Sequence, residues 1–336
     1  MPGFLLSLQH HPYIPYILVG SAAVYLIVAA VWRLPWFSRP ELQMWLWSLP
    51  LLAPVLGYIY YLGSAGRCSM GGLGPGGMWP ARWHIICRSE PWFTGIILPL
   101  MFATFAYSLF KIFANSYVAH RMVKKNPPLS GDDASRVTAI LRPRLADLGI
   151  GLPDLRLWPG KTALAFAMGF AHPVLVVSRG LLDRFDDQQL EAVLTHELVH
   201  LARRDTLRSW LGVLLRDGMF FSPFGRVAFR HFMRKQEEAV DDRVVAMTQK
   251  PLLYAETLLK IWKDGRQTDG RQTVVSGPAP REFLVFPGFA SHVGTLENRI
   301  QRVLNSEASG ERFKFTSRAL LALVLGLVLV VVLFAC

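Results

Sequence analysis

The sequence predicts an α-helical membrane protein with four transmembrane helices and one inserted α+β domain. Three observations support this fold class. The first 62 residues hold only three charged side chains, although 18% of the whole chain is charged. Four apolar runs have the length of a bilayer crossing. A more hydrophilic stretch, long enough for a domain, separates the third run from the fourth.

Composition excludes several other classes of protein. Disorder requires low hydrophobicity, whereas 52% of this chain is hydrophobic. Three cysteines in 336 residues are too few for a disulfide-dense scaffold. The net charge of +12 fits either nucleic acid or an anionic membrane surface. Because no nucleic-acid motif accompanies the charge, we expect membrane lipid as a partner and no nucleic acid.

The predicted transmembrane helices cover residues 13–32, 44–62, 94–113 and 319–335. The first three place residues 1–114 in a membrane region. The last is the shortest, and its 17 residues reach about 26 Å as a helix, close to the roughly 30 Å hydrocarbon core. A cleavable signal peptide is the alternative for the first run. No lysine or arginine precedes that run, so we expect a retained helix.

Basic residues flank the inserted domain, predicted over residues 115–317, on both sides. They are Lys111, Arg121, Lys124, Lys125, Arg312, Lys314 and Arg318. Because positive flanks stay in the cytoplasm, we expect a multi-pass protein of the cell (inner) membrane, with a cytoplasmic domain and both termini outside. Arg67, Arg82 and Arg88 oppose this orientation with a smaller bias. The sequence leaves open whether Cys68 and Cys87, then outside, form a disulfide.

The inserted domain is predicted to combine a small sheet with helices. Asp133–Leu148 has a helical pattern that we expect to be interrupted or kinked near Pro143. Three short runs of strand-forming residues follow, at 155–158, 163–168 and 174–177. A second helix begins at Asp186, a residue type that caps helices, with Gln189 three residues later. This succession predicts a compact α+β unit.

The helix that begins at Asp186 contains a metal-binding pattern. Residues 195–200 read Thr-His-Glu-Leu-Val-His. His196 and His200 are four residues apart, so both imidazoles project from one helix face and can hold one ion. Glu197 is rotated about 100° from His196, close enough to act on water at that ion. A catalytic zinc needs three protein ligands and one open position, so we expect a third donor elsewhere in the chain.

An acidic helical stretch over residues 233–250 offers that third donor. Its centre contains Glu237, Glu238, Asp241 and Asp242. One carboxylate can bind the metal while a second, one turn later, orients a ligand imidazole. The alternative is a solvated helix face with charge pairs four residues apart. The spacing alone permits two registers, one starting at Glu237 and one at Glu238.

Several segments resemble known membrane zinc peptidases. The pattern consists of His196–His200, Leu201–Asp205, Phe220–Pro223 and Glu237–Asp241. It is similar to that of the gluzincins of peptidase family M56, the BlaR/MecR type, and of the related family M48, the HtpX type. Lys161–Phe166 and Val176–Leu182 resemble the strand region of both families. The layout of three spans, a domain and a fourth span is closer to family M56.

The resemblance implies a zincin-like fold and one Zn²⁺ per chain. It assigns the metal to His196, His200 and Glu237, the role of general base to Glu197, and the orienting carboxylate to Asp241. Glu237 is preferred to Glu238 because Glu237, Ala239 and Asp241 fit the family's Glu-x-Ala-x-Asp spacing. We also expect an edge strand to bind extended substrate by β-addition. Its residues are Ala163, Leu164, Ala165 and Phe166.

The function implied is a zinc metalloendopeptidase that cleaves a cytosolic or membrane-proximal protein in signal transduction. Because the sequence ends at Cys336, directly after the fourth span, we expect no penicillin-sensing domain. One alternative is a broad-specificity quality-control protease of the HtpX type. Another is a non-catalytic scaffold or transporter with structural zinc, although the spans lack the ionisable residues of a transport pathway.

The sequence leaves several properties open. It does not name the substrate or the activating signal, and it does not decide whether the chain forms homo-oligomers or cleaves itself. The residue that stabilises the oxyanion is also unassigned. His231 and Tyr254 are weak candidates for that role.

Overall fold

A computed structural model describes residues 13–33, 37, 39–64, 90–169, 172–269 and 293–305. The chain forms two compact units. The described residues of the first unit lie between positions 13 and 109 and over Gly212–Phe232, and the second unit comprises Phe110–Leu211 and Met233–Arg312. The sequence had placed Gly212–Phe232 in the inserted domain. The predicted boundaries at residues 114 and 317 remain predictions.

Helices occupy the first three predicted spans. They are α2 (Tyr13–Val31), α3 (Pro40–Ser64) and α5 (Glu90–Lys125). Residues 319–335, like Cys68 and Cys87, lie outside the described residues. Among the helices that the structure describes, none combines the length and apolar character that a bilayer crossing needs. The prediction of four crossings is therefore not confirmed.

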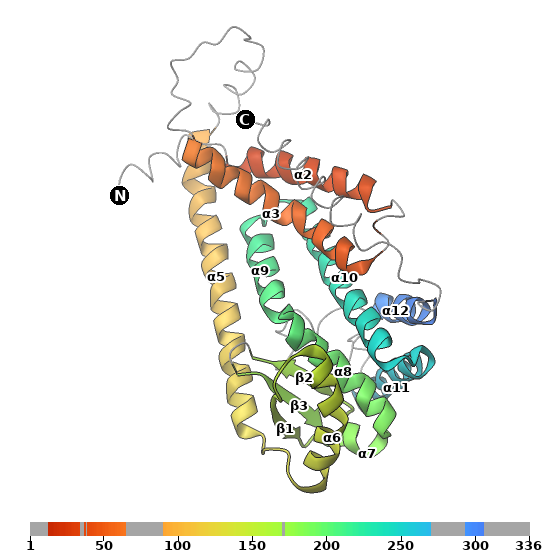
Figure 1. Ribbon diagram of the computed structural model, residues 1–336. Coiled ribbons are helices and arrows are strands. Elements are labelled where there is room, and N and C mark those ends of the chain that lie inside the picture. The colour runs from red at the N-terminus through yellow and green to blue at the C-terminus, as the bar shows by residue number, and fades with distance from the viewer. Residues whose placement is uncertain are drawn as a thin grey trace. The chain divides into compact units, whose positions relative to one another are not determined.

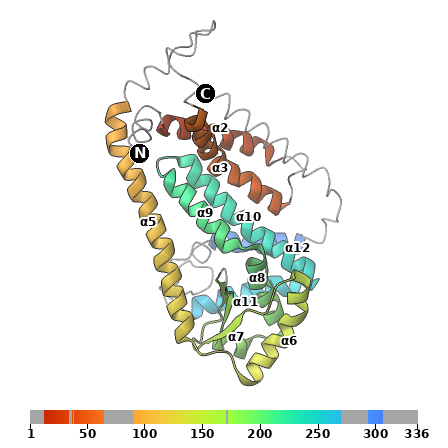
Figure 2. The ribbon, with the colours of Figure 1, turned by 60° about the vertical axis from the view of Figure 1, so that its left-hand side comes forward.

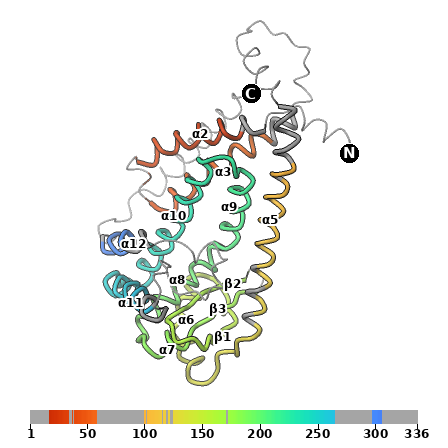
Figure 3. The backbone as a smooth tube through the Cα atoms, turned by 180° about the vertical axis from the view of Figure 1, so that it is seen from behind, coloured from red at the N-terminus to blue at the C-terminus, as the bar shows by residue number. Residues whose placement is uncertain are grey.

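The first unit packs α2 directly against α3, as Figure 3 shows. The rings of Tyr25 and Trp47 approach to 5.6 Å between centroids. The buried hydroxyls of Ser21 and Ser222 share a hydrogen bond of 2.7 Å. Ser222 also accepts the Gly225 N–H at the start of α10 (Pro223–Thr248). These contacts explain why Gly212–Phe232 groups with the N-terminal helices.

The second unit contains a three-stranded sheet in the order β1-β3-β2 (Figure 1). Its strands are β1 (Asp154–Trp158), β2 (Ala165–Met168) and β3 (Val174–Ser178). β1 runs parallel to β3, and β2 runs antiparallel to it. All three predicted strands are confirmed to within two residues at each end. β2 forms one edge of the sheet.

Helices make up most of the second unit. They are α6 (Gly131–Leu148), α7 (Arg179–Arg184), α8 (Asp187–Arg203), α11 (Pro251–Asp269) and α12 (Val293–Asn305), with parts of α5, α9 (Asp205–Gly218) and α10. The predicted helix at 133–148 is confirmed as α6, which runs through Pro143 as one helix. α8 contacts α6, β2 and α11, and α11 contacts α12 (Figure 2). α8 is thus the central helix of this unit.

An apolar stripe fixes α8 in that position. Leu190, Leu194 and Leu198 recur every fourth residue and are fully buried against α6 and the sheet. Full burial of one such side chain stabilises a fold by about 1.5–3 kcal/mol. Asp186 accepts the Gln189 N–H at 2.9 Å, which confirms the predicted helix start. The helix is therefore fixed both in rotation and at its beginning.

We predict that Ser178→Ala lowers the free energy of unfolding by about 2–4 kcal/mol, because two buried N–H groups lose their acceptor. The Ser178 hydroxyl accepts from Leu164 N–H at 2.9 Å and from Leu181 N–H at 3.1 Å. Denaturant unfolding of the full chain measures the change. Ser135→Ala, which removes only an exposed hydrogen bond to Gly131, should change stability by less than about 0.5 kcal/mol. Equal stabilities for the two variants would contradict the prediction.

Candidate metal centre

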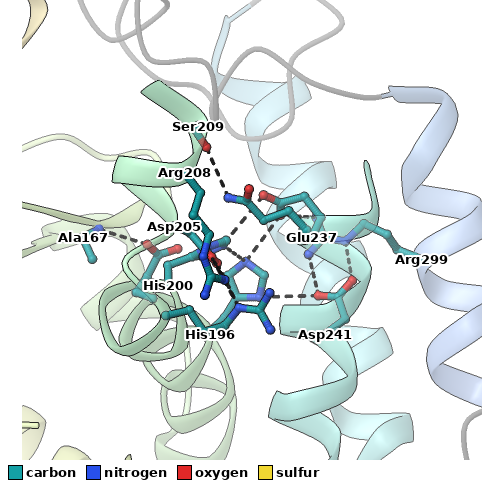
Figure 4. A network of polar contacts seen from close by, with 12 residues as sticks. Ala167, His196, His200, Asp205, Arg208, Ser209, Glu237, Asp241 and Arg299 are labelled. Atoms are coloured by element: carbon teal, nitrogen blue, oxygen red, sulfur yellow. Dashed lines mark hydrogen bonds and ion pairs between the residues drawn. The ribbon is translucent and has the colours of Figure 1, made fainter. Parts of the chain in front are cut away.

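Two histidines of α8 and one glutamate of α10 converge within the second unit (Figure 4). The Nε2 atoms of His196 and His200 are 3.2 Å apart. Glu237 places Oε2 3.7 Å from His196 Nε2 and Oε1 3.8 Å from His200 Nε2. Ligands of a tetrahedral zinc are about 3.4 Å from one another, given metal bonds of about 2.0–2.1 Å. These three donors therefore fit one ion.

The packing of α8 against α10 creates this convergence. Val240 and Val244 of α10 are fully buried in one cluster with Ala192 and Val199 of α8. Glu237 lies one turn before Val240 and so faces the histidines of α8. Within the described part of the chain, no other group of three histidine, cysteine or acidic side chains comes this close. The structure thus brings together the three residues that the sequence predicted.

Asp205 orients the His200 imidazole through its Nδ1 atom. Its Oδ2 lies 2.9 Å from His200 Nδ1, which leaves Nε2 directed toward Glu237. Arg204 ends α8 in the left-handed conformation, with φ at 55°, and Asp205 then begins α9. This turn brings the carboxylate back to the helix that it follows. A carboxylate on the outer nitrogen fixes the tautomer of a metal-binding histidine, and sequence reasoning had not assigned this role to Asp205.

Asp241 occupies the corresponding position behind His196. Its Oδ1 is 3.4 Å from His196 Nδ1 and accepts the Tyr254 hydroxyl proton at 2.6 Å. The Tyr254 oxygen is itself 2.9 Å from His196 Nδ1. Arg299 of α12 donates to both oxygens of Asp241, at 2.7 and 2.8 Å. The carboxylate predicted to orient an imidazole therefore lies beside one.

The structure distinguishes between the two possible registers of the acidic residues on α10, one starting at Glu237 and one at Glu238. Glu238 accepts from Lys235 at 2.7 Å, and Asp242 binds Arg302. Neither of these carboxylates belongs to the group of three donors, whereas Glu237 does. This arrangement favours the register that starts at Glu237.

Glu197 lies next to the edge strand of the sheet. Its Oε2 accepts the Ala167 N–H at 2.9 Å. Ser178 N–H donates to Leu164 C=O, and antiparallel bonding alternates along a strand. Phe166 therefore pairs with β3. The N–H and C=O of Ala165 and the C=O of Ala167 face the free edge of β2, on which no strand among the described residues pairs. The predicted base and the strand edge are thus joined directly.

The predicted substrate strand is only partly within β2. Ala165 and Phe166 belong to the strand, while Ala163 and Leu164 precede it. The N–H of Ala163 donates to Asp264, and that of Leu164 donates to Ser178. These two groups are therefore already engaged.

The carboxylates make this site favourable for a cation. Burial lowers the pKa of His200, but Glu237, Asp205 and Glu197 outweigh it and raise that pKa to about 9. Burial raises the pKa of Glu197 despite the two nearby imidazoles. Burial also opposes ionisation of Asp241, yet Arg299 and His196 hold its pKa well below the usual range. Two imidazoles and a carboxylate are donors that suit zinc, and its charge would replace a proton on His200.

The structure gives no support to the two weak oxyanion candidates. Tyr254 is buried, and its hydroxyl contacts Asp241 and His196 Nδ1, on the side of the imidazole away from Nε2. His231 stacks on Trp47 in the first unit, with ring centroids 4.2 Å apart. Tyr254 instead joins the polar network behind His196.

Comparison with known proteins places these residues in a family. The family model described as BlaR1 peptidase M56 matches residues 92–278, which is more than half of the chain. A Protease HtpX homolog of Trichormus variabilis is 36% identical over 101 residues, covering 30% of this chain and 35% of that protein. Protease HtpX of Chromohalobacter salexigens is 35% identical over 96 residues, covering 27% and 32% respectively. Protease HtpX of Pseudomonas syringae pv. syringae is 40% identical over 80 residues, covering 23% and 27%.

The chain thus spans roughly a third or less of the length of these curated relatives. The family model includes both α8 and Glu237. The likeness therefore includes the helices that carry the three donors.

We predict that Glu237→Gln weakens binding of Zn²⁺ by more than the roughly 10- to 100-fold that loss of an outer partner costs. The physical reason is the loss of an anionic donor from the group of three. Competition with a chromophoric chelator measures the affinity. Glu238→Gln is the matched control, since Glu238 pairs with Lys235 and Arg302 instead. If Glu238→Gln bound Zn²⁺ weakly while Glu237→Gln bound it tightly, the register that starts at Glu238 would be correct.

Proposed function

Because this chain belongs to peptidase family M56, we propose that it is a membrane-embedded zinc endopeptidase that hydrolyses a cytosolic or membrane-proximal protein. The observation that carries this proposal is the convergence of His196, His200 and Glu237 beside Glu197. Among the residues that the structure describes, three donors converge here. Three protein ligands are typical of a catalytic zinc, whereas structural zinc sites have four. This difference weighs against a scaffold with structural zinc.

In the proposed reaction His196, His200 and Glu237 would hold one zinc. When bound, zinc polarises the scissile carbonyl and lowers the pKa of water to about 7. Glu197 accepts the proton of the attacking water and then donates it to the leaving nitrogen. The Ala167 N–H donates to the Glu197 carboxylate at 2.9 Å and so orients it for these transfers. Burial raises the pKa of Glu197 toward that of an effective base.

We propose that substrate adds as a strand to the free edge of β2. The N–H and C=O of Ala165 and the C=O of Ala167 face that edge, because the register pairs Phe166 with β3. Ala167 also donates its N–H to Glu197. A peptide aligned on this edge would therefore pass directly beside the base. Main-chain pairing of this kind accepts many sequences, so side-chain pockets would set specificity.

Two kinds of protease fit this chemistry. One cleaves a single regulatory protein in signal transduction, and the other removes many damaged membrane proteins. The relatives are named Protease HtpX, which favours neither substrate range because the chain covers only part of them. We propose regulatory proteolysis as the function and broad quality control as the alternative.

We further propose that the protein is a multi-pass protein of the cell membrane, with a cytoplasmic protease domain and both termini outside. The low charge of the first 62 residues supports contact with lipid. The basic residues on both flanks of the predicted domain support its cytoplasmic location.

We predict that Glu197→Gln lowers kcat by about 10²- to 10⁴-fold, because only the proton acceptor is lost. Bound zinc and thermal stability should match those of the unchanged chain. Cleavage of a peptide library in detergent measures the rate. Glu256→Gln, which alters an exposed glutamate of α11, should cleave normally. Undiminished cleavage by Glu197→Gln would assign the base to another residue or the activity to a contaminant.

The same variant distinguishes the two substrate ranges. Glu197→Gln should bind substrate without cleaving it, so crosslinking in native membranes captures the bound proteins. One dominant captured protein would support regulatory proteolysis. Many unrelated proteins would support quality control.

We predict that Ala165→Pro raises KM by about 2- to 10-fold, because one backbone donor at the free edge is lost. Proline is tolerated where a strand N–H faces away from its neighbour. Steady-state cleavage of a peptide measures KM, with zinc content and melting temperature as checks on folding. Ala165→Gly retains the donor and should bind peptide normally. An unchanged KM in a folded Ala165→Pro variant would exclude pairing at this position.

A further inference from the structure

Arg299 of α12 is buried beside the metal centre but is not one of the three donors. Its side chain is 15% exposed, and that of its partner Asp241 is 1% exposed. Nε and Nη2 donate to the two oxygens of Asp241 at 2.7 and 2.8 Å. This two-bond geometry fixes the plane of the carboxylate, and Figure 4 shows the guanidinium directed into the site.

The carboxylate that Arg299 holds also contacts a predicted ligand. Asp241 Oδ1 lies 3.4 Å from His196 Nδ1 and accepts from the Tyr254 hydroxyl. Rotation of Asp241 would therefore disturb the hydrogen bonds that orient the His196 ring. Arg299 controls that rotation because it occupies both carboxylate oxygens.

The same guanidinium reaches a second predicted ligand. Nη1 of Arg299 lies 3.9 Å from Glu237 Oε2. One planar group thus links two carboxylates that are four residues apart on α10. The ammonium group of a lysine cannot reproduce this geometry, because it is a point charge without a planar fork.

We propose that Arg299 is a positioning residue of the metal centre, which sets the orientation of His196 and Glu237 through its contacts with Asp241 and Glu237. This inference rests on the proposed function and extends it to α12. The zinc affinity and the rate of hydrolysis then depend on the packing position of α12. A residue 58 positions after Asp241 in the chain thus belongs to the site.

The competing explanation is that Arg299 only anchors α12 to α10. Arg302 provides a direct comparison, because it lies three residues later on the same helix and also binds a carboxylate of α10 through two bonds. These bonds join it to Asp242 at 3.1 and 2.9 Å. Asp242 is outside the group of donors around the histidines. Arg302 therefore anchors α12 without a link to the site.

The test compares Arg299→Lys with Arg302→Lys in the full chain. Each variant retains a positive charge and loses a two-bond contact. We expect Arg299→Lys to weaken Zn²⁺ binding by about 10- to 100-fold, as loss of an outer partner typically does, and Arg302→Lys to leave it within about 2-fold. The visible spectrum of the Co²⁺-substituted protein should change only in Arg299→Lys, because it reports ligand geometry. Melting temperatures without metal measure the anchoring that both residues share.

A double-mutant cycle keeps the test valid if Arg299→Lys does not fold. The single variant Asp241→Asn is compared with the double variant Asp241→Asn, Arg299→Gln. The double variant removes both charges of this pair and so leaves neither one buried and unpaired. If Arg299 acts mainly through Asp241, the double variant binds Zn²⁺ no more weakly than Asp241→Asn alone. Independent effects would instead multiply.

The outcomes separate this inference from the proposed function. Equal effects of Arg299→Lys and Arg302→Lys on zinc affinity and on the Co²⁺ spectrum would overturn the positioning role. A further loss in the double variant would overturn the route through Asp241 and leave only the direct contact with Glu237. In both cases the unchanged chain would still bind zinc and cleave peptide. An unchanged chain that bound no Zn²⁺ would overturn the proposed function and this inference together.

Discussion

The burial of α8 is the constraint on which the site depends. Leu190, Leu194 and Leu198 fix one side of this helix against α6 and the sheet, while Ala192 and Val199 pack in the cluster that includes α10 and α11. With these two sides buried, the helix cannot rotate. The remaining side carries His196 and His200, which are half-buried. The apolar residues thus decide where the imidazoles point.

Charge compensation then holds the polar side of the site in place. Asp205 is bound by Arg203 and Arg208, and Asp241 is bound by Arg299. A buried carboxylate without such a partner would tend to accept a proton and lose its charge. Burial opposes ionisation of both carboxylates, but His200, Arg203 and Arg208 lower the pKa of Asp205, and Arg299 and His196 lower the pKa of Asp241. Ionised carboxylates in turn make the imidazoles stronger donors to a cation.

Local spacing explains how much the sequence could predict. The four-residue interval of His196 and His200, the cap at Asp186 and the three strands follow from helix and strand periodicity. The roles of Asp205 and Arg299 depend on a left-handed turn and on a contact across 58 residues. No periodic pattern encodes those. The grouping of Gly212–Phe232 with the first unit likewise depends on tertiary contacts, such as that between Ser21 and Ser222.

The hydrogen bond between Glu197 and Ala167 links packing to chemistry. α8 carries the base and contacts β2, so the same interface positions the proton acceptor and the strand edge. A base held by a backbone N–H needs little reorganisation when a peptide arrives, and catalysis benefits most from groups that are already in place. Glu237, on a third element, completes the donor set. The site is therefore assembled from three elements. α8 packs in one apolar cluster with the sheet and in another with α10, so a shift of α8 would move the base and two of the three metal donors together.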